Sequence, residues 1–268
     1  MVTFQTNIID FHMHAFPDKI AQRTIATLQE ISQTTPVTDG TIEQTILQLK
    51  RCHITAGVIM PIATKPAQQT NINNWAAQIQ QQYSDLYCFG SVHPDAPNAI
   101  EELYRIKELH LKGVKLHPDY QHFNISEPRL FPIYETISKL GLPVLFHTGK
   151  DPVSPNHIHA PAVETAKVCD HFPDMIIIAA HLGGLMDYEQ AEQHLVGKNL
   201  YLDTSMAKYC SPEQLKRIIL NHGANHILFA TDCPWGNGLE DISRLKALNL
   251  SKSDLDAIFY QNALQLLG

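Results

Sequence analysis

The amino-acid sequence predicts an α/β fold, a (β/α)₈ TIM barrel in a single domain spanning residues 1–268, on three observations. Short apolar runs alternate along the chain with segments of helical spacing, which favours βαβ units and a parallel sheet. Eight such runs occur in 268 residues, and eight strand–helix repeats in about 250 residues are typical of a closed barrel. No GxGxxG follows the first run, which disfavours a dinucleotide-binding sheet.

The strands are expected where short runs of apolar residues occur. Residues 17–55 separate the first two runs and leave room for about two helices or a lid. The eight expected strands cover residues 7–14, 56–63, 86–94, 112–118, 142–149, 175–184, 199–205 and 226–236.

Helices are expected between these strands, where apolar residues recur every three or four positions. The clearest are at residues 98–111, 128–141, 161–173 and 211–223. The last of these should end at His222 and Gly223, because glycine commonly terminates helices. Residues 253–267 form an amphipathic pattern that an N-cap serine or aspartate opens.

Composition excludes several classes of partner. Acidic residues outnumber basic ones by 27 to 20, giving a net charge of −7. With no basic cluster, nucleic acid and anionic membranes are not expected as partners. No run approaches the roughly 18 apolar residues of a membrane helix, and no signal peptide is visible. The five cysteines contain no CxxC pair, which favours free thiols in a reducing cytoplasm. A homodimer is the default expectation for oligomeric state.

The stretch IIDFHMHAF places two histidines at the end of the first expected strand. Because side chains alternate along a strand, His12 and His14 should share one face, with Phe11 and Met13 on the other. Two imidazoles on one face could bind a metal ion together or could be buried structural histidines.

The position of other polar residues favours the metal interpretation. Each follows an apolar run, at the carboxyl end of an expected strand, where barrels carry their active sites. These residues are His12, His14, Lys115, His117, His147, His181 and Asp232. Three imidazoles and one carboxylate, from His12, His14, His147 and Asp232, form a donor set that suits zinc with an open position. Such an ion lowers the pKa of bound water to about 7, or polarises a substrate carbonyl or phenolate.

The remaining candidates have more than one interpretation. His181, followed by Gly183 and Gly184, is expected to act as a general acid or base beside space for substrate, or to be structural. Asp232 could also accept a proton from water. Asp10 is expected to orient a histidine or to close the barrel through a hydrogen bond.

Lys115 and His117 have the same strand parity and should both face inward. Lys115 could pair with a substrate carboxylate, form a carbamylated bridge between two metals or make a buried salt bridge. His117 could contact substrate or bond to backbone at the rim. Tyr120 and Trp235 lie in or beside the expected loops at the same end and are candidates for lining the substrate pocket.

Four motifs in this order, DFHMH, FHTG, AHLGG and ATDCPWG, resemble those of the amidohydrolase superfamily. Within it the chain is most similar to the amidohydrolase-2 group, which contains aminocarboxymuconate semialdehyde decarboxylase and many TIM-barrel metal-dependent hydrolases. The resemblance implies one zinc or manganese ion held by His12, His14, His147 and Asp232. It also implies that His181 activates water or contacts substrate. The segment GVKLHP resembles the fourth-strand segment of the predicted hydrolases of this group. The best-known decarboxylases differ at this segment.

Three functional hypotheses follow. The first is a hydrolase that uses a metal-activated water on an ester, lactone or amide of a small molecule. The second is a metal-dependent, non-oxidative decarboxylase of a small aromatic or enoic acid. The third is a catalytically silent barrel that binds a small molecule. Decarboxylation would require a cation that faces a carboxylate in a dry site, which distinguishes the second hypothesis from the first.

Overall fold

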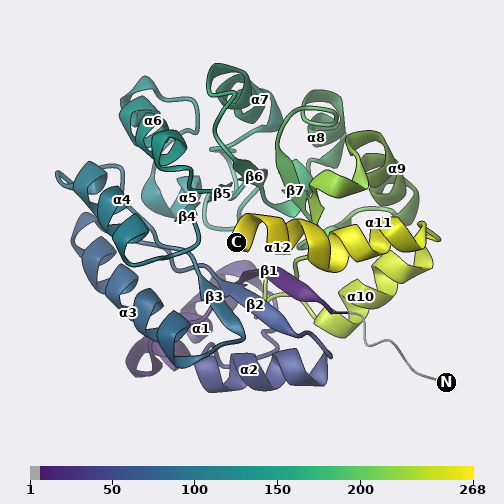
Figure 1. The fold of residues 1–268 in the computed structure, drawn as a ribbon, viewed down its shortest axis with the longest axis horizontal. Helices are drawn as coiled ribbons and strands as arrows, with labels where there is room; N and C mark the ends of the chain where they lie inside the picture. The colour runs from purple at the N-terminus through teal and green to yellow at the C-terminus, as the bar shows by residue number, and fades with distance from the viewer. Residues whose placement is uncertain (1–6) are drawn as a thin grey trace.

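A computed structural model, which describes residues 7–268, contains eight parallel strands surrounded by helices (Figure 1). The prediction of a (β/α)₈ barrel is confirmed. The strands are shorter than the apolar runs that contain them, because each run also includes residues of the adjoining turns and loops. They are β1 (Ile9–Met13), β2 (Ala56–Ile59), β3 (Leu86–Cys88), β4 (Val114–Leu116), β5 (Val144–Phe146), β6 (Ile177–Ala179), β7 (Tyr201–Asp203) and β8 (Ile227–Leu228).

The strands form two sheets, of order β1-β2-β3 and β4-β5-β6-β7-β8, and backbone hydrogen bonds join them at two seams. At the first seam, the Gly90 amide donates to the Gly113 carbonyl at 2.8 Å, beside a parallel bridge to Val114. At the second, the Phe11 amide donates to the Phe229 carbonyl at 2.9 Å. These contacts close the barrel.

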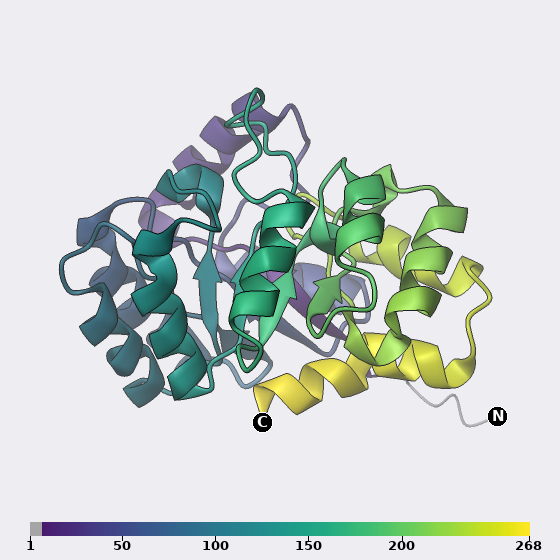
Figure 2. The same ribbon diagram turned by 90° about the horizontal axis from the view of Figure 1, so that it is seen from above.

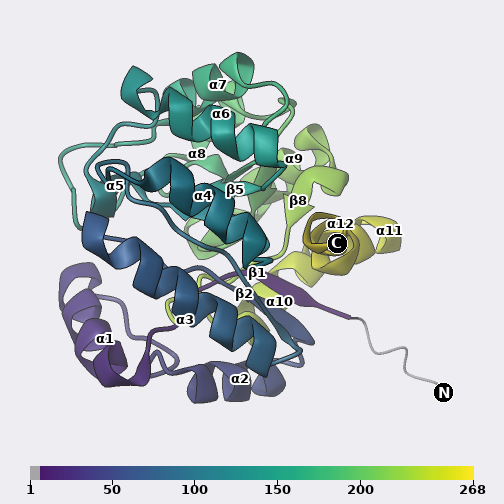
Figure 3. The same cartoon turned by 60° about the vertical axis from the view of Figure 1, so that its left-hand side comes forward.

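Helices alternate with the strands and cover the outside of the barrel (Figure 3). They are α1 (Asp18–Ser32), α2 (Ile42–Arg51), α3 (Gln69–Gln82), α4 (Ala99–Glu108), α5 (Pro118–Gln121), α6 (Phe131–Leu140), α7 (Ala162–His171), α8 (Tyr188–His194), α9 (Pro212–His222), α10 (Gly238–Ala247), α11 (Lys252–Asp256) and α12 (Asn262–Leu267). The two helices expected between the first strands are α1 and α2.

Local sequence signals fix several of the helix ends. The Ser211 side chain accepts a hydrogen bond from the Gln214 amide at the start of α9, which satisfies an amide that would otherwise lack a partner. This helix ends at His222, as predicted. The predicted helix 253–267 differs from the structure, because Ser251 caps α11 and a π-helical turn at Ala257–Gln261 divides the segment.

The apolar core has two layers. The larger cluster lies between the strands and the surrounding helices. The smaller one fills the barrel interior and includes Ile9, Phe11, Val58, Phe89, Leu145, Ile178 and Leu228. Ala263 and Leu267 of α12 belong to this inner cluster, so the C-terminal helices seal one end of the barrel. Figure 2 shows them at the end opposite α1 and the segment that follows β5.

Strand β1 contains a bulge that changes the direction of its side chains. Asp10 pairs with Gly57 and Met13 pairs with Ile59, so β1 contains one more residue than β2 between these two pairs. Phe11 packs in the inner cluster whereas Met13 packs in the outer one. The prediction that Phe11 and Met13 share a face is therefore wrong, because a bulge breaks strict alternation.

All five cysteines are free and buried. Among the described residues, no helix has the length and apolar character needed to cross a membrane.

Candidate metal centre

Three side chains from the two strands at the second seam converge at the carboxyl end of the barrel. His12 and His14 come from β1 and its end, and Asp232 follows β8. The Nε2 atoms of His12 and His14 are 3.2 Å apart. Oδ1 of Asp232 lies 3.2 Å from Nε2 of His14 and 3.6 Å from Nε2 of His12. These residues could hold one metal ion.

The chemistry and spacing of the three donors suit a divalent ion. Tetrahedral ligands at about 2.1 Å from an ion are about 3.4 Å from one another, and the three separations, 3.2, 3.2 and 3.6 Å, bracket this value. Two imidazole nitrogens and one carboxylate oxygen are ligands that zinc and manganese accept. Three protein donors leave a coordination position for water or substrate.

Hydrogen bonds at Nδ1 of His12 and His14 leave the lone pair of each Nε2 available to bind a metal ion. Nδ1 of His12 lies 2.8 Å from Oδ2 of Asp203. Nδ1 of His14 lies 2.8 Å from the Met60 carbonyl oxygen. Because both partners are acceptors, each Nδ1 carries the hydrogen. Such outer hydrogen bonds are characteristic of metal-binding histidines.

The electrostatics of the site favour a neutral His12 and an ionised Asp232. Burial and the nearby Lys115 hold the pKa of His12 well below its usual range. Burial opposes ionisation of Asp232, but the neighbouring side chains of His12, His14 and Lys115 outweigh it and lower the pKa of Asp232. Neutral imidazoles and a carboxylate are the protonation states that bind a metal.

The predicted catalytic residues His181 and Asp232 have unusual backbone conformations. Their φ angles are 57° and 61°, a left-handed conformation that costs non-glycine residues about 1–3 kcal/mol when it is strained. Each occurs where the chain turns sharply out of the barrel after a strand. The surrounding fold holds both residues in this geometry, and such positions concentrate at functional sites.

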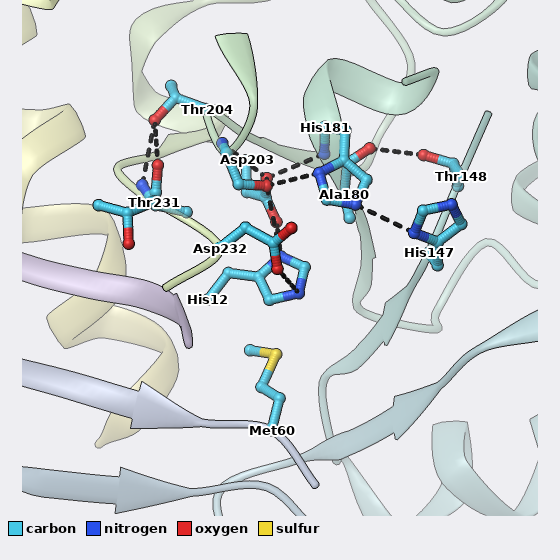
Figure 4. Close-up of polar contacts among 12 residues, drawn as sticks. His12, Met60, His147, Thr148, Ala180, His181, Asp203, Thr204, Thr231 and Asp232 are labelled. Carbon is cyan, nitrogen blue, oxygen red and sulfur yellow. Dashed lines mark hydrogen bonds and ion pairs between the residues drawn. The ribbon is translucent and has the colours of Figure 1, made fainter. Parts of the chain in front are cut away.

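His181 lies in a hydrogen-bonded chain of buried side chains (Figure 4). Its Nε2 is 3.0 Å from Nδ1 of His147, and its Nδ1 is 2.8 Å from Oγ of Ser205. The Asp203 carboxylate accepts from the His181 amide at 2.9 Å. Burial, followed by the charge of His147, holds the pKa of His181 well below its usual range. This chain could relay a proton beside the three donors.

Lys115 is completely buried in β4 and points to the same centre. Its Nζ lies 3.2 Å from Nε2 of His12. Burial lowers its pKa to about 8, which leaves the amine mostly protonated at neutral pH. Both predicted inward positions, Lys115 and His117, are buried.

His147 lies outside the closely spaced donor group of His12, His14 and Asp232. Its Nδ1 meets His181, and its Nε2 lies 3.3 Å from the Lys150 carbonyl oxygen. Together with His117 and Asp151 it forms a separate group of donors within 4.8 Å of one another. Its role as a fourth ligand of the first group stays a prediction.

The two aromatic candidates lie in different surroundings. The Tyr120 ring packs edge-on against His117, with ring centroids 4.3 Å apart. Trp235 is half-buried, and its carbonyl oxygen accepts a hydrogen bond from Lys208 Nζ at 3.0 Å. Their role as substrate contacts stays a prediction.

Sequence reasoning missed Asp203, Ser205, Asp119 and Asp151. Asp203 lies near the carboxyl end of the expected strand 199–205, so the rule that selected the other residues at the barrel mouth also applied to Asp203. Asp10 does not orient a histidine ring. It accepts from the Thr231 amide at 3.0 Å and from its hydroxyl at 2.5 Å, which fulfils the alternative of closing the barrel.

The expected role of Gly183 and Gly184 is also wrong. A Cβ at Gly183 would lie 2.5 Å from Cδ1 of Leu195, and one at Gly184 would lie 3.1 Å from the Asp187 carbonyl oxygen. These glycines allow close packing around α8 and do not open space for substrate.

Comparison with known families decides the relationship of the chain. Residues 9–268 match the family model described as Amidohydrolase. The chain belongs to the amidohydrolase family. This family includes the amidohydrolase-2 group that the sequence motifs resemble. None of the curated protein sequences matches this amidohydrolase.

Solved structures similar to this amidohydrolase share its barrel. An uncharacterized TIM-barrel protein from Bordetella bronchiseptica has a TM-score of 0.76 and 20% identity, covering 97% of this chain and 98% of its own. The 5-carboxyvanillate decarboxylase LigW from Sphingomonas paucimobilis has a TM-score of 0.73 and 16% identity, over 98% and 99%. A dihydroxybenzoic acid decarboxylase from Polaromonas sp. JS666, with bound manganese and 2-nitroresorcinol, has a TM-score of 0.73 and 17% identity, over 98% and 97%. At these identities the likeness shows the fold.

Proposed function

We propose that this amidohydrolase is a metal-dependent, non-oxidative decarboxylase of a small aromatic or enoic acid. The observation that carries the proposal is the position of Lys115. Its ammonium group is wholly buried and lies 3.2 Å from Nε2 of His12. A cation in a dry site beside the metal donors is what a substrate carboxylate requires.

In this proposal His12, His14 and Asp232 hold one divalent ion, zinc or manganese. When bound, the ion would act as a Lewis acid towards a substrate oxygen. Lys115 orients the carboxylate that leaves. The carbon–carbon bond breaks, carbon dioxide departs, and a proton replaces it on the substrate carbon. His181, whose Nδ1 meets the Ser205 hydroxyl, is the side chain proposed to move that proton.

The comparisons support the same reaction class. Two of the similar solved structures are named decarboxylases, and one of them contains manganese. The substrates in their names are 5-carboxyvanillate and dihydroxybenzoic acid, and the second structure also contains the inhibitor 2-nitroresorcinol. This agrees with a barrel mouth that combines a metal donor group, a buried cation and half-buried aromatic residues.

The test is carbon dioxide release from hydroxybenzoic and enoic acids by the zinc- or manganese-loaded protein. Lys115→Met should lower kcat/KM about 10²–10³-fold, because it removes a charged donor from the carboxylate. It should leave the metal content unchanged. Lys139→Met, a change of the same type on α6 outside the site, is the matched control. Lys115→Met with unchanged kcat/KM, or no release from any acid, would refute the proposal.

Hydrolysis is the second candidate, and the three-donor group favours it because it leaves a position for water. Asp232, ionised and beside His14, could accept the proton of that water. Cleavage of esters, lactones or amides by the same protein, without carbon dioxide release, would favour hydrolysis. The donor group itself argues against a catalytically silent binding barrel.

A further inference from the structure

We propose that Ser205, which lies two residues beyond the end of β7, is a positioning residue of this site. Its hydroxyl sets the direction of a line of hydrogen bonds that begins at Asp203 and includes His181 and His147. That direction decides which ring nitrogen of each histidine carries the hydrogen. The inference deepens the proposed function, on which its part in catalysis rests, but the positions of the hydrogens can be measured without a substrate.

The line consists of four contacts between buried groups. Oγ of Ser205 is hydrogen-bonded to Oδ1 of Asp203 and lies 2.8 Å from Nδ1 of His181. Nε2 of His181 is 3.0 Å from Nδ1 of His147 (Figure 4). Nε2 of His147 is 3.3 Å from the Lys150 carbonyl oxygen. The four side chains are at most 4% exposed, so they depend on one another for hydrogen bonds.

These four contacts share three hydrogens. The Ser205 hydroxyl supplies one. Each imidazole supplies one, because burial holds the pKa of His181 well below its usual range and lowers the pKa of His147 to about 4. A neutral imidazole has one N–H and one lone pair, and carboxylate and carbonyl oxygens only accept. One of the contacts must therefore lack a hydrogen, and the position of that contact fixes both tautomers.

The contact that lacks a hydrogen is the one between His147 and the Lys150 carbonyl oxygen. At 3.3 Å it is the longest of the four, beyond the range of about 2.7–3.2 Å that is typical of N–H···O bonds. An empty contact anywhere else would place two lone pairs 3.0 Å apart or closer. At Asp203 it would also remove a charge-assisted bond, which is about twice as strong as a neutral one. Ser205 therefore donates to Asp203, and Nδ1 of His181 donates to Ser205. In turn, Nδ1 of His147 donates to Nε2 of His181.

Asp203 is thus the common acceptor of two hydrogen-bond systems. Its Oδ2 accepts from Nδ1 of His12 at 2.8 Å, and its Oδ1 ends the line that passes through Ser205. The line leaves a lone pair on Nε2 of His147, which is the state that the predicted role of His147 as a metal ligand requires. Without the Ser205 hydroxyl, two hydrogens remain for two contacts. The line then reverses towards Lys150, and Nε2 of His147 carries the hydrogen.

The test reads both tautomers from long-range proton–nitrogen NMR spectra of the full-length protein, with its histidines labelled with nitrogen-15. Spectra are recorded after chelation and again with zinc, and the variants His181→Asn and His147→Asn assign the two rings. The wild type should carry both hydrogens on Nδ1 in either state. Ser205→Ala should carry both on Nε2 after chelation, and its zinc affinity should be about 10–100-fold lower. Ser243→Ala, which removes an exposed hydroxyl of α10, is the matched control and should resemble the wild type in both measurements.

The outcomes separate this inference from the proposed function. A hydrogen on Nε2 of either histidine in the chelated wild type overturns the inferred direction, and this result does not require Ser205→Ala to fold. The same tautomers in Ser205→Ala as in the wild type overturn the role of Ser205. Reversed tautomers in Ser205→Ala, together with no carbon dioxide release by the wild type, support this inference and refute the proposed function. Carbon dioxide release that depends on Lys115, together with unreversed tautomers in Ser205→Ala, overturns this inference and leaves the proposed function standing.

Discussion

Replacing Asp203 with asparagine should weaken metal binding at His12 without unfolding the barrel. The Asp203 carboxylate accepts from Nδ1 of His12 at 2.8 Å and from the amides of His181 and Ser205 at 2.9 and 3.0 Å. In Asp203→Asn, the remaining oxygen can keep the two amide bonds, but an NH₂ group now faces Nδ1 of His12. The histidine must then move its hydrogen to Nε2, which removes the free donor atom.

Loss of such an outer carboxylate lowers metal affinity about 10–100-fold, or about 1.4–2.7 kcal/mol. We expect this shift in zinc affinity, measured by competition with a chelating dye, with a far-ultraviolet spectrum like that of the wild type. Asp241→Asn, which changes another buried aspartate in α10, should bind zinc normally. Equal zinc affinities of Asp203→Asn and wild type would refute the argument that Asp203 sets the tautomer of His12.

Two further predictions concern stability. Burial lowers the pKa of His222 to about 4 from 6.5, so the unfolded chain takes up a proton first and the free energy of unfolding should fall between these pH values, by up to about 3 kcal/mol. Urea unfolding should show that the free energy of unfolding of His222→Gln falls less steeply with decreasing pH than that of the wild type. An identical dependence on pH would contradict the assignment of this stability loss to His222. Gly149 has φ of 90°, and a Cβ there would lie 2.0 Å from the Leu185 amide nitrogen, so Gly149→Ala should cost more than about 3 kcal/mol. Gly141 is also left-handed, but no atom lies within 4 Å of a Cβ built there, so Gly141→Ala should cost only about 1 kcal/mol. Equal losses of stability in Gly149→Ala and Gly141→Ala would show that crowding at Gly149 is not the cause.

The strand rhythm was sufficient to predict the barrel and the convergence of His12, His14 and Asp232. Parallel strands bring their carboxyl ends to one mouth, so residues far apart in sequence meet there once the strands are located. The same rule placed Lys115 and His117 inside. Each of these predictions depended only on which end of a strand a residue occupies.

The details that failed depend on contacts between distant segments. The bulge in β1 is visible only in its register with β2, so strict alternation misassigned Phe11 and Met13. The bond between His12 and Asp203 joins residues 191 positions apart, and no local pattern announces it. The packing of Gly183 against Leu195 likewise depends on how α8 docks.

The seam between β8 and β1 passes directly through the proposed metal centre. His12 and His14 lie on one side and Asp232 on the other, and the Asp232 amide donates to the His12 carbonyl at 2.9 Å. An ion held by these side chains would therefore cross-link β1 to the segment that follows β8. Local opening of the seam between β8 and β1 would then be thermodynamically coupled to release of the ion. Slow hydrogen exchange at the amides of Phe11 and Asp232 would then report on occupancy of the centre as directly as a metal assay does.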